Sequence, residues 1–359
     1  MKFGLFTLFD FFADLQNERD YFRDTIALLK EAEALGYDSV WVGEEHFYSF
    51  GICPNPQMFL AALARETTTM RLGTAISVLP LEHPLRKAEE FALLDQLSNG
   101  RADFGAGTGG IPKHFAGFGI DPSEKRDRYE ESLEVIEKAW RNKTFSHEGK
   151  FWNIPEISVS PRPVQTPCIP IYRGVLGLVS FTVAGTKGHS IQVPPWMAQD
   201  NVILQGIKDH RAALKAHGHT HVADPVFMFS LYCSNDYKSA LAEARTVVLR
   251  YRDLLASNFP LDAGKILPPG DSMRDLYDML TTTEEHFEER VIVGTPAQCR
   301  RRIAELRDKY SAEHMGFYLH AGARNIDSAR KSLRLFADEV MPEFKTANTP
   351  ANSQATIRA

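Results

Sequence analysis

The fold is decided by the stretch at residues 36–46, which reads GYDSVWVGEEH. Gly36 ends an amphipathic run over residues 19–35, and glycine is the residue most often found just past the end of a helix. The run at residues 38–42, which ends with three apolar residues, is typical of a buried strand, and charged residues follow it after Gly43. A helix, a glycine, a buried strand and a polar loop in this order indicate parallel strands that are joined by helices.

The same pattern recurs along the chain. Strand-like runs are predicted at residues 3–8, 38–42, 71–78, 102–106, 169–174, 189–193, 226–233 and 315–319. Helices are predicted at residues 19–35, 56–67, 84–97, 124–141, 179–187, 200–217, 237–257, 296–309 and 326–340. We count seven βα units and one strand of uncertain place, for which the region of Val291 is a candidate. The sequence therefore predicts an α/β protein with a single-domain (β/α)8 TIM barrel.

The barrel domain is expected to span residues 1–344. Residues 259–290 contain several prolines and glycines with only a short helical patch, so they are expected to form a mobile lid inserted before the last βα unit. Residues 345–359 have almost no apolar content and are expected to be a disordered tail.

Composition excludes several classes of protein. The 359 residues carry 41 Lys and Arg against 46 Asp and Glu, a net charge of -5, and this balance gives no electrostatic reason to bind nucleic acid or an anionic membrane. The chain has no uncharged apolar run of 18 residues and no signal-peptide profile. The four cysteines lie far apart, without the spacing of a zinc site or a disulfide framework. We therefore expect a cytoplasmic protein with reduced thiols.

A glycine-rich loop follows the predicted strand at residues 102–106. Residues 105–110 read GAGTGG and formally match the dinucleotide-binding fingerprint. That fingerprint should open a helix at once, whereas Pro112, Gly117 and Gly119 are expected to keep this chain irregular. We interpret the segment instead as a loop whose small residues let backbone N–H groups approach a flat or phosphorylated ligand.

Several histidines and acids could have chemical roles. Glu44, Glu45 and His46 follow a strand at the rim where barrel enzymes carry their chemistry, and two carboxylates beside an imidazole can supply a base near neutrality. The alternative is a solvated acidic turn.

The other histidines are expected to have structural roles. His83 is expected to be a polar residue at a helix start, and the histidines within 217–221 are expected to form a turn. No metal site is therefore predicted.

With these pieces in order, the sequence resembles the bacterial luciferase-like, flavin-dependent monooxygenase family over roughly residues 1–344. The resemblance is carried by residues 1–4, 36–41, 44–47, 50–51, 55–56, 73–75, 79–80, 83–84, 94–98, 100–101 and 294–296. It implies a (β/α)8 barrel that holds reduced FMN at the C-terminal ends of the strands.

The resemblance also implies a cofactor site. The flavin ring would lie against the third strand at Ala75 and Ile76, where relatives often have a non-proline cis peptide. Two loops would approach the ribityl chain and phosphate, with hydroxyls from Ser180 and Thr182 and N–H groups from the first turn of the following helix. The expected cofactor-binding residues are Ala75, Ile76, Ser77, Gly107, Thr108, Gly109, Leu176, Gly177 and Ser180.

Departures from the family pattern change some of these expectations. Luciferase-type sites carry a histidine where this chain has Glu45, so the catalytic base is expected to be Glu45 or His46. Thr108 stands where luciferase has a phosphate-binding arginine, and residues 176–177 replace polar phosphate contacts. Phosphate binding would then depend on backbone donors and on Arg173. Light emission is not expected.

The function implied by the resemblance is that of a two-component FMNH2-dependent monooxygenase. Reduced flavin from a partner NAD(P)H:flavin reductase would react with O2 to give a flavin hydroperoxide, which inserts one oxygen atom into a small organic substrate. Hydroxylation, aldehyde oxidation and Baeyer-Villiger insertion all stay open. The expected apolar wall of the substrate pocket is made of Phe6, Phe9, Phe12, Phe47, Phe50 and Trp196.

Two other functions are compatible with the same residues. One is a deazaflavin-dependent oxidoreductase on the same barrel. The other is a flavin-binding protein without turnover, which the altered residues Glu45, Thr108 and Leu176 favour. Relatives of this type often pair through helices near the second and third strands, so a homodimer is expected.

Overall fold

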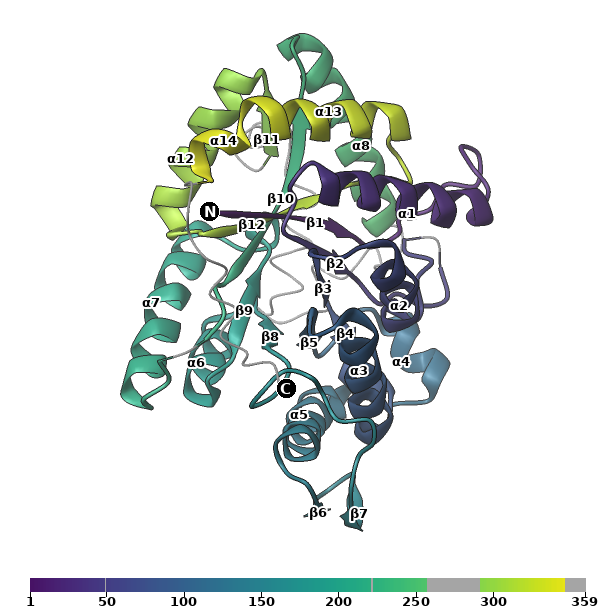
Figure 1. The fold of residues 1–359 in the computed structure, drawn as a ribbon, viewed down its shortest axis with the longest axis vertical. Coiled ribbons are helices and arrows are strands. Elements are labelled where there is room, and N and C mark those ends of the chain that lie inside the picture. The colour runs from purple at the N-terminus through teal and green to yellow at the C-terminus, as the bar shows by residue number, and fades with distance from the viewer. Residues whose placement is uncertain (49, 221, 257–290, 346–359) are drawn as a thin grey trace.

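The computed structural model describes residues 1–256, except 49 and 221, and residues 291–345. A closed ring of parallel strands forms its centre (Figure 1). Around the ring the strands are β1 (Lys2–Thr7), β2 (Ser39–Val42), β3 (Arg71–Thr74), β5 (Ala102–Gly107), β8 (Ile171–Gly174), β9 (Ser190–Val193), β10 (Val226–Cys233) and β12 (His314–Tyr318). β12 pairs with β1 and closes the ring. The predicted (β/α)8 barrel is confirmed.

Two further strands pair with strands of the ring. β4 (Ser77–Val78) follows β3 and pairs with β5. β11 (Val291–Gly294) pairs with the C-terminal half of β10, whose Ser230 is opposite Val291 on one side and Tyr318 on the other. The region of Val291 is therefore not needed as the eighth barrel strand, because the eight predicted runs already supply the ring.

The helices lie outside the strands and match the predicted ranges within one or two residues at each end. They are α1 (Glu18–Ala34), α2 (Pro56–Glu66), α3 (Pro84–Ser98), α5 (Lys125–Arg141), α6 (Leu178–Lys187), α7 (Asp200–Ala216), α8 (Tyr237–Ala256), α12 (Pro296–Tyr310) and α13 (Ile326–Glu339). Capping residues and prolines determine where several of these helices begin. Asn55 accepts a hydrogen bond from the N–H of Met58, and Pro56 occupies the first turn, where a missing N–H costs nothing.

Shorter elements connect these units. They are α4 (Pro112–Phe118), α14 (Met341–Phe344), the 3-10 turns η1 (Leu79–Leu81), η2 (Pro122–Glu124) and η3 (Pro195–Met197), and the antiparallel hairpin of β6 (Phe145–Glu148) and β7 (Asn153–Ile157). The hairpin projects beyond α5 (Figure 1). The sequence prediction missed this hairpin and α4, which are both too short for a clear periodicity.

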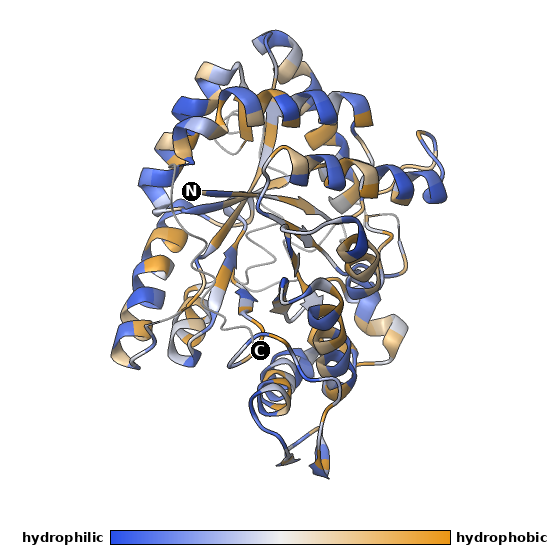
Figure 2. Ribbon diagram, in the orientation of Figure 1, coloured by the Kyte–Doolittle hydropathy of each residue, from blue (hydrophilic) through white to orange (hydrophobic). Residues whose placement is uncertain are grey.

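Strand side chains alternate between two cores. On β1, Phe3 and Leu5 join the core between barrel and helices, whereas Phe6 joins a cluster inside the barrel. The helix faces that cover the first core are apolar and their outer faces are polar (Figure 2). Inside the barrel, a β-carbon on Gly73 would lie 2.3 Å from the ring of Trp41, so only glycine leaves room for this indole.

Two predicted segments fall largely or wholly outside what the structure describes. The lid at 259–290 lies outside it entirely, and of the tail at 345–359 only Lys345 is described. Over the chain that is described, no helix has both the length and the apolarity needed to cross a membrane.

Candidate active site

The C-terminal ends of β2 and β3 form the first part of the site. The peptide bond between Ala75 and Ile76 is cis, as the resemblance implies. The N–H of Ala75 donates to the carbonyl of Val42 at 2.8 Å, and the N–H of Glu44 donates to the carbonyl of Ile76 at 3.1 Å. The end of β2 therefore holds both residues of the cis peptide in place.

Glycines make a smooth wall beside this peptide. A β-carbon on Gly107 would lie 2.1 Å from Cδ1 of Ile76, and one on Gly174 would lie 3.1 Å from Cγ2 of the same side chain. Gly109 has φ of +69°, which suits a turn that only glycine adopts freely. The structure thus brings together the predicted residues in β4 and at the C-terminal ends of β3 and β5, namely Ala75, Ile76, Ser77, Gly107, Thr108 and Gly109.

The predicted residues after β8 lie at the start of α6. Gly177 is the N-cap of α6, and a β-carbon there would meet no atom within 4 Å. Ser180 Oγ donates to the carbonyl of Gly177 at 2.6 Å, so this hydroxyl is already engaged. Leu178 and Val179 in the first turn are 42% and 65% exposed, so this end of the helix is open to a ligand. Leu176 lies half-buried just before the turn.

Arg173 does not face this turn, and its expected role in phosphate binding is wrong. Its guanidinium donates to both carboxylate oxygens of Glu130, at 2.7 and 3.0 Å, and to Nδ1 of His189 at 2.9 Å. Side chains alternate along a strand, so Tyr172 points into the barrel and its neighbour Arg173 points out toward α5.

Glu44 is the centre of a buried polar group. Its Oε1 lies 3.1 Å from Nε2 of His46, and its Oε2 lies 3.4 Å from Nζ of Lys87 and accepts the N–H of Val78 at 3.2 Å. Burial opposes ionisation of Glu44, but the charge of Lys87 and the contact with His46 outweigh it and lower the pKa of this carboxyl. Lys87 also pairs with Glu82 at 3.0 Å.

Glu45 has different partners. Its Oε2 lies 3.3 Å from Nε2 of His114 and accepts the hydroxyl of Tyr48 at 3.3 Å. Burial raises the pKa of Glu45, and these contacts only partly offset that effect. The N–H of His46 donates to Nε2 of His114 at 3.1 Å, so that nitrogen acts as an acceptor. Nε2 of His114 therefore lies between the amide of His46 and the carboxyl of Glu45.

The two predicted catalytic residues are thus adjacent but separately held, Glu45 by His114 and Tyr48, His46 by Glu44. The alternative of a solvated acidic turn is wrong, because Glu44, Glu45 and His46 are 3%, 9% and 7% exposed. Sequence reasoning missed His114, which lies on α4 in the segment expected to be irregular. It also missed Lys87, which looks like an ordinary surface lysine of a helix.

The aromatic residues predicted for the pocket wall separate into two groups. Phe6, Phe50 and Trp196 belong to the cluster inside the barrel or pack against it. Phe9 is fully buried in the outer core against Tyr21 and Phe59, so its expected place in the wall is wrong. Phe9 continues the alternation of Phe3 and Leu5, which also belong to the outer core.

Phe12 and Phe47 line a surface cleft of about 820 Å3 that reaches Glu45 and His46. The loops after β1 and β2 form this cleft. Phe47 is 59% exposed, and the guanidinium of Arg250 lies 4.2 Å from the ring centre of Phe12. The cleft therefore connects the predicted acid-base residues with solvent.

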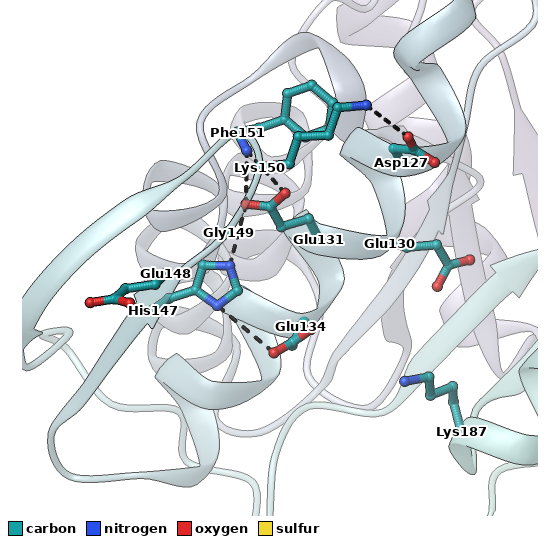
Figure 3. Close-up of a pocket in the computed structure, with 10 residues that line it drawn as sticks. All are labelled: Asp127, Glu130, Glu131, Glu134, His147, Glu148, Gly149, Lys150, Phe151 and Lys187. Atoms are coloured by element: carbon teal, nitrogen blue, oxygen red, sulfur yellow. Dashed lines mark hydrogen bonds and ion pairs between the residues drawn. The ribbon is translucent and has the colours of Figure 1, made fainter.

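A second cleft, of about 420 Å3, lies over α5 and the β6–β7 hairpin (Figure 3). Its acidic groups have partners within the protein. Glu131 accepts the N–H groups of Phe151 and Trp152 and contacts His147, and Asp127 pairs with Lys150 at 3.0 Å. These contacts fasten the hairpin to α5, and we assign this cleft a structural role.

Three further histidines considered in the sequence analysis have backbone partners, and His221 lies outside the described residues. Nδ1 of His83 accepts the N–H of Leu85 at the start of α3, as predicted. Ring nitrogens of His217 and His219 contact carbonyls of Ala213 and Thr186. The described residues hold no group of three His, Cys, Asp or Glu side chains that could bind a metal ion.

Comparisons with known proteins agree with this geometry. The family model for luciferase-like monooxygenases matches residues 1–313. The oxygenase component of the flavin-dependent trigonelline monooxygenase of Acinetobacter baylyi is 26% identical, over 100% of this chain and 99% of that protein. A monooxygenase from Streptomyces bottropensis superposes with a TM-score of 0.85 and 25% identity, covering 96% of this chain and 100% of that chain.

Two more distant structures share the fold. One is the oxygenating constituent of 3,6-diketocamphane monooxygenase from Pseudomonas putida, a type II Baeyer-Villiger monooxygenase in complex with FMN. Its TM-score is 0.78 at 21% identity, covering 97% of this chain and 99% of that chain. The other is an F420-dependent secondary alcohol dehydrogenase, with a TM-score of 0.74 at 18% identity, covering 96% and 99%.

Proposed function

The chain belongs to the luciferase-like monooxygenase family, and from this premise we propose that it is the oxygenase component of a two-component, FMNH2-dependent monooxygenase. The observation that carries the proposal is the smooth wall of Ala75, Ile76, Gly107 and Gly174 at the mouth of the barrel. A flat ring system needs such a surface without projecting side chains. Reduced FMN bound there supplies activation of O2 for transfer of one oxygen atom to a substrate.

The wall fits a flavin for a steric reason. Gly107 and Gly174 leave room for the side chain of Ile76, which covers this part of the wall. A larger residue at Gly107 would push Ile76 toward the place proposed for the ring. The chain's contribution here is to present apolar surface and to exclude water from one face of the flavin.

The first turn of α6 is the proposed phosphate site. A helix N-terminus offers unpaired N–H groups to an anion, and Gly177 leaves open space beside them. Arg173 faces away, so the phosphate would be held mainly by backbone donors. We expect moderate affinity, which suits a reduced flavin that a separate NAD(P)H:flavin reductase delivers. The description of a relative as an oxygenase component supports such a partner.

Glu45 is the proposed acid-base residue. Burial raises the pKa of its carboxyl, so it can hold a proton that a solvated glutamate would lose. His114 and Tyr48 orient the group, and the cleft beside it gives access to solvent. His46 is proposed to assist through its contact with Glu44.

The test is an anaerobic titration of the purified protein with photoreduced FMN, followed by mixing with oxygenated buffer. Saturable binding, with reoxidation slower than that of free flavin, is the expected result. Binding with no change in reoxidation would favour a flavin-binding protein without turnover. Binding of a reduced deazaflavin in place of FMN would favour the deazaflavin-dependent oxidoreductase that the F420-dependent neighbour suggests.

Variants of the acid-base residues separate catalysis from binding. Trigonelline is the first substrate to try, because a relative over the full chain is named for it. Glu45→Gln and the double variant Glu45→Ala/His46→Ala are expected to bind FMN normally and to lose oxygenation about 100-fold. Glu148→Gln, on the exposed side of the β6–β7 hairpin, is the control. Unchanged oxygenation in the double variant would remove both residues from the mechanism.

A homodimer is also part of the proposal. Met58 on α2 and Leu93 and Leu97 on α3 are large apolar side chains that are 72%, 49% and 41% exposed. α2 and α3 follow the second and third strands of the barrel, where relatives of this type pair. Light scattering should give twice the 40.4 kDa of one chain, and a monomeric mass would contradict this assignment.

A further inference from the structure

We propose that Tyr251, Tyr318 and His320 form a binding site for a neutral acceptor oxygen of the substrate, such as the oxygen of a carbonyl group. The inference rests on the proposed function and names the chemical class that this function would act on. It concerns the side of the barrel mouth that is not occupied by the flavin wall, which consists of Ala75, Ile76, Gly107 and Gly174.

Three polar rings meet at this place. Tyr318 is the last residue of β12, and its ring packs inside the barrel 4.8 Å from that of Phe6. Tyr251 reaches in from the last turns of α8, and its ring centre is 5.1 Å from those of both Tyr318 and Phe50. His320 lies two residues beyond Tyr318, with ring centres 3.7 Å apart. Elements far apart in the sequence therefore direct three polar side chains to one point.

The polar atoms of these rings are buried and have few partners. Nδ1 of His320 has no hydrogen-bond partner among the residues that the structure describes, and the hydroxyls of Tyr251 and Tyr318 have none there except their contact with each other. The three side chains are 4%, 3% and 2% exposed. Buried polar atoms in proteins are nearly always fully bonded, so this group points to a ligand atom that completes its hydrogen bonds. The other nitrogen of His320 is already held, 2.9 Å from Oγ of Ser230.

The charge of the surroundings selects a neutral ligand. Burial raises the pKa of Tyr251 and Tyr318 well above 10 and lowers that of His320 well below 6.5, so all three groups are neutral at pH 7. Asp10 is buried close enough to raise the pKa of both tyrosines further, and a negative charge here would repel a carboxylate ligand. A neutral hydroxyl donor then suits an acceptor oxygen that carries no charge.

The place of this group fits a substrate held opposite the flavin. Ala75 of the cis peptide belongs to the same cluster inside the barrel as Tyr251 and Tyr318. β12 and β3 are separated around the ring by β1 and β2. An oxygen bound to the tyrosines would therefore leave the rest of a small molecule on the side of Ala75 and Ile76.

The test compares two probes of one shape. Acetophenone carries a carbonyl oxygen where α-methylstyrene carries a CH2 group, so the pair differs in the acceptor alone. Binding to the flavin-free protein is measured by calorimetry or saturation-transfer NMR. We expect acetophenone to bind about tenfold more tightly, the effect of one or two net hydrogen bonds. Tyr251→Phe and Tyr318→Phe should each remove most of this preference without changing α-methylstyrene binding.

Tyr37→Phe is the matched control. Its hydroxyl is also buried, but it donates to the carbonyl of Leu333 in the outer core, away from the barrel mouth. This variant should keep the preference for acetophenone. Equal affinity of the two probes in the wild-type protein, or an equal loss in Tyr37→Phe, would overturn the proposal.

The outcome is separable from that of the proposed function. Failure of the wild-type protein to bind reduced FMN would refute the proposed function. The affinities of the two probes could still be compared in that case. Normal FMN binding with no discrimination between the probes would remove the oxygen site alone. If a tyrosine variant does not fold, the affinities of the wild-type protein for the two probes still test the proposed oxygen site.

Discussion

The Nζ atom of Lys87 lies 3.4 Å from Oε2 of Glu44, and both side chains are almost completely buried. A lysine is rarely placed in such a position without a charged partner. The same carboxylate accepts the N–H of Val78 and contacts His46. One ion pair between α3 and the end of β2 thus supports both the strand beside the cis peptide and one of the proposed catalytic residues.

Removing one partner of this pair should be more harmful than removing both. Lys87→Met leaves the Glu44 carboxylate buried without its cation, and we expect a loss of about 3 to 5 kcal/mol in the free energy of unfolding. Lys87→Met/Glu44→Gln should recover a large part of that loss. Urea unfolding of the four proteins in the cycle measures the coupling. Lys30→Met, in an exposed pair with Glu66, is the control, and an equal effect there would contradict the prediction.

The free energy of unfolding should decrease as the pH rises, because of Asp10. Burial raises the pKa of this carboxyl from 3.8 to about 7, although the backbone amides of Gly322 and Ala323 oppose the effect. The folded state then holds this proton more tightly than the unfolded state. The stabilisation is fully present below about pH 4 and is lost as pH rises through about 7. The difference of about three pKa units corresponds to at most about 4 kcal/mol.

Asp10→Asn should flatten this dependence and make the protein more stable than the wild type at pH 8. Urea unfolding at pH 5, 6, 7 and 8 provides the measurement. A wild-type slope that persists in the variant would show that another group causes it.

The flavin wall should be sensitive to one methyl group. Gly107→Ala would place a β-carbon 2.1 Å from Cδ1 of Ile76, so the side chain of Ile76 must move toward the proposed flavin. We expect FMN affinity to fall at least about tenfold, the cost of a modest steric clash. Ile76→Val removes Cδ1, and Gly107→Ala/Ile76→Val should therefore recover binding. Fluorescence titration with FMN tests the pair, and equal affinity of Gly107→Ala and wild type would refute the assigned wall.

Arg173 should contribute to the free energy of unfolding but not to the affinity for FMN. Its guanidinium is held by Glu130 and His189 on the outer side of β8. Arg173→Met should reduce the free energy of unfolding by about 2 kcal/mol, the value of hydrogen bonds to charged groups, and leave FMN affinity unchanged. Thermal unfolding and FMN titration of one preparation give both quantities. A large loss of FMN affinity in the folded variant would restore this arginine to the phosphate site.

Local periodicity was sufficient to predict most of the barrel. The helix at 19–35 and the strand at 38–42 are α1 and β2 within one residue, because the spacing of apolar side chains reports directly which face of an element is buried. α4 was missed because seven residues that include a glycine carry little periodicity. His114 was lost with it, although it is the partner of Glu45.

Alternation along single strands decided other residues of the site. Arg173 looks suited to a phosphate in the sequence, but its neighbour Tyr172 occupies the inward position and turns it outward. Phe9 lies near other predicted pocket residues in the sequence, yet it shares the face of Phe3 and Leu5 and is buried in the outer core. Neither orientation follows from composition, because each depends on where the preceding strand residue points.

The sequence by itself determined the order and type of the main elements, the family, and the strand ends at which the candidate residues collect, because these depend on short-range patterns. Only the tertiary structure decided which side chains meet. Glu45 meets His114, Glu44 meets Lys87, and Tyr251 meets Tyr318 across separations of 69, 43 and 67 residues. Closing the barrel brings such residues together, and the low dielectric of its interior then fixes their charges.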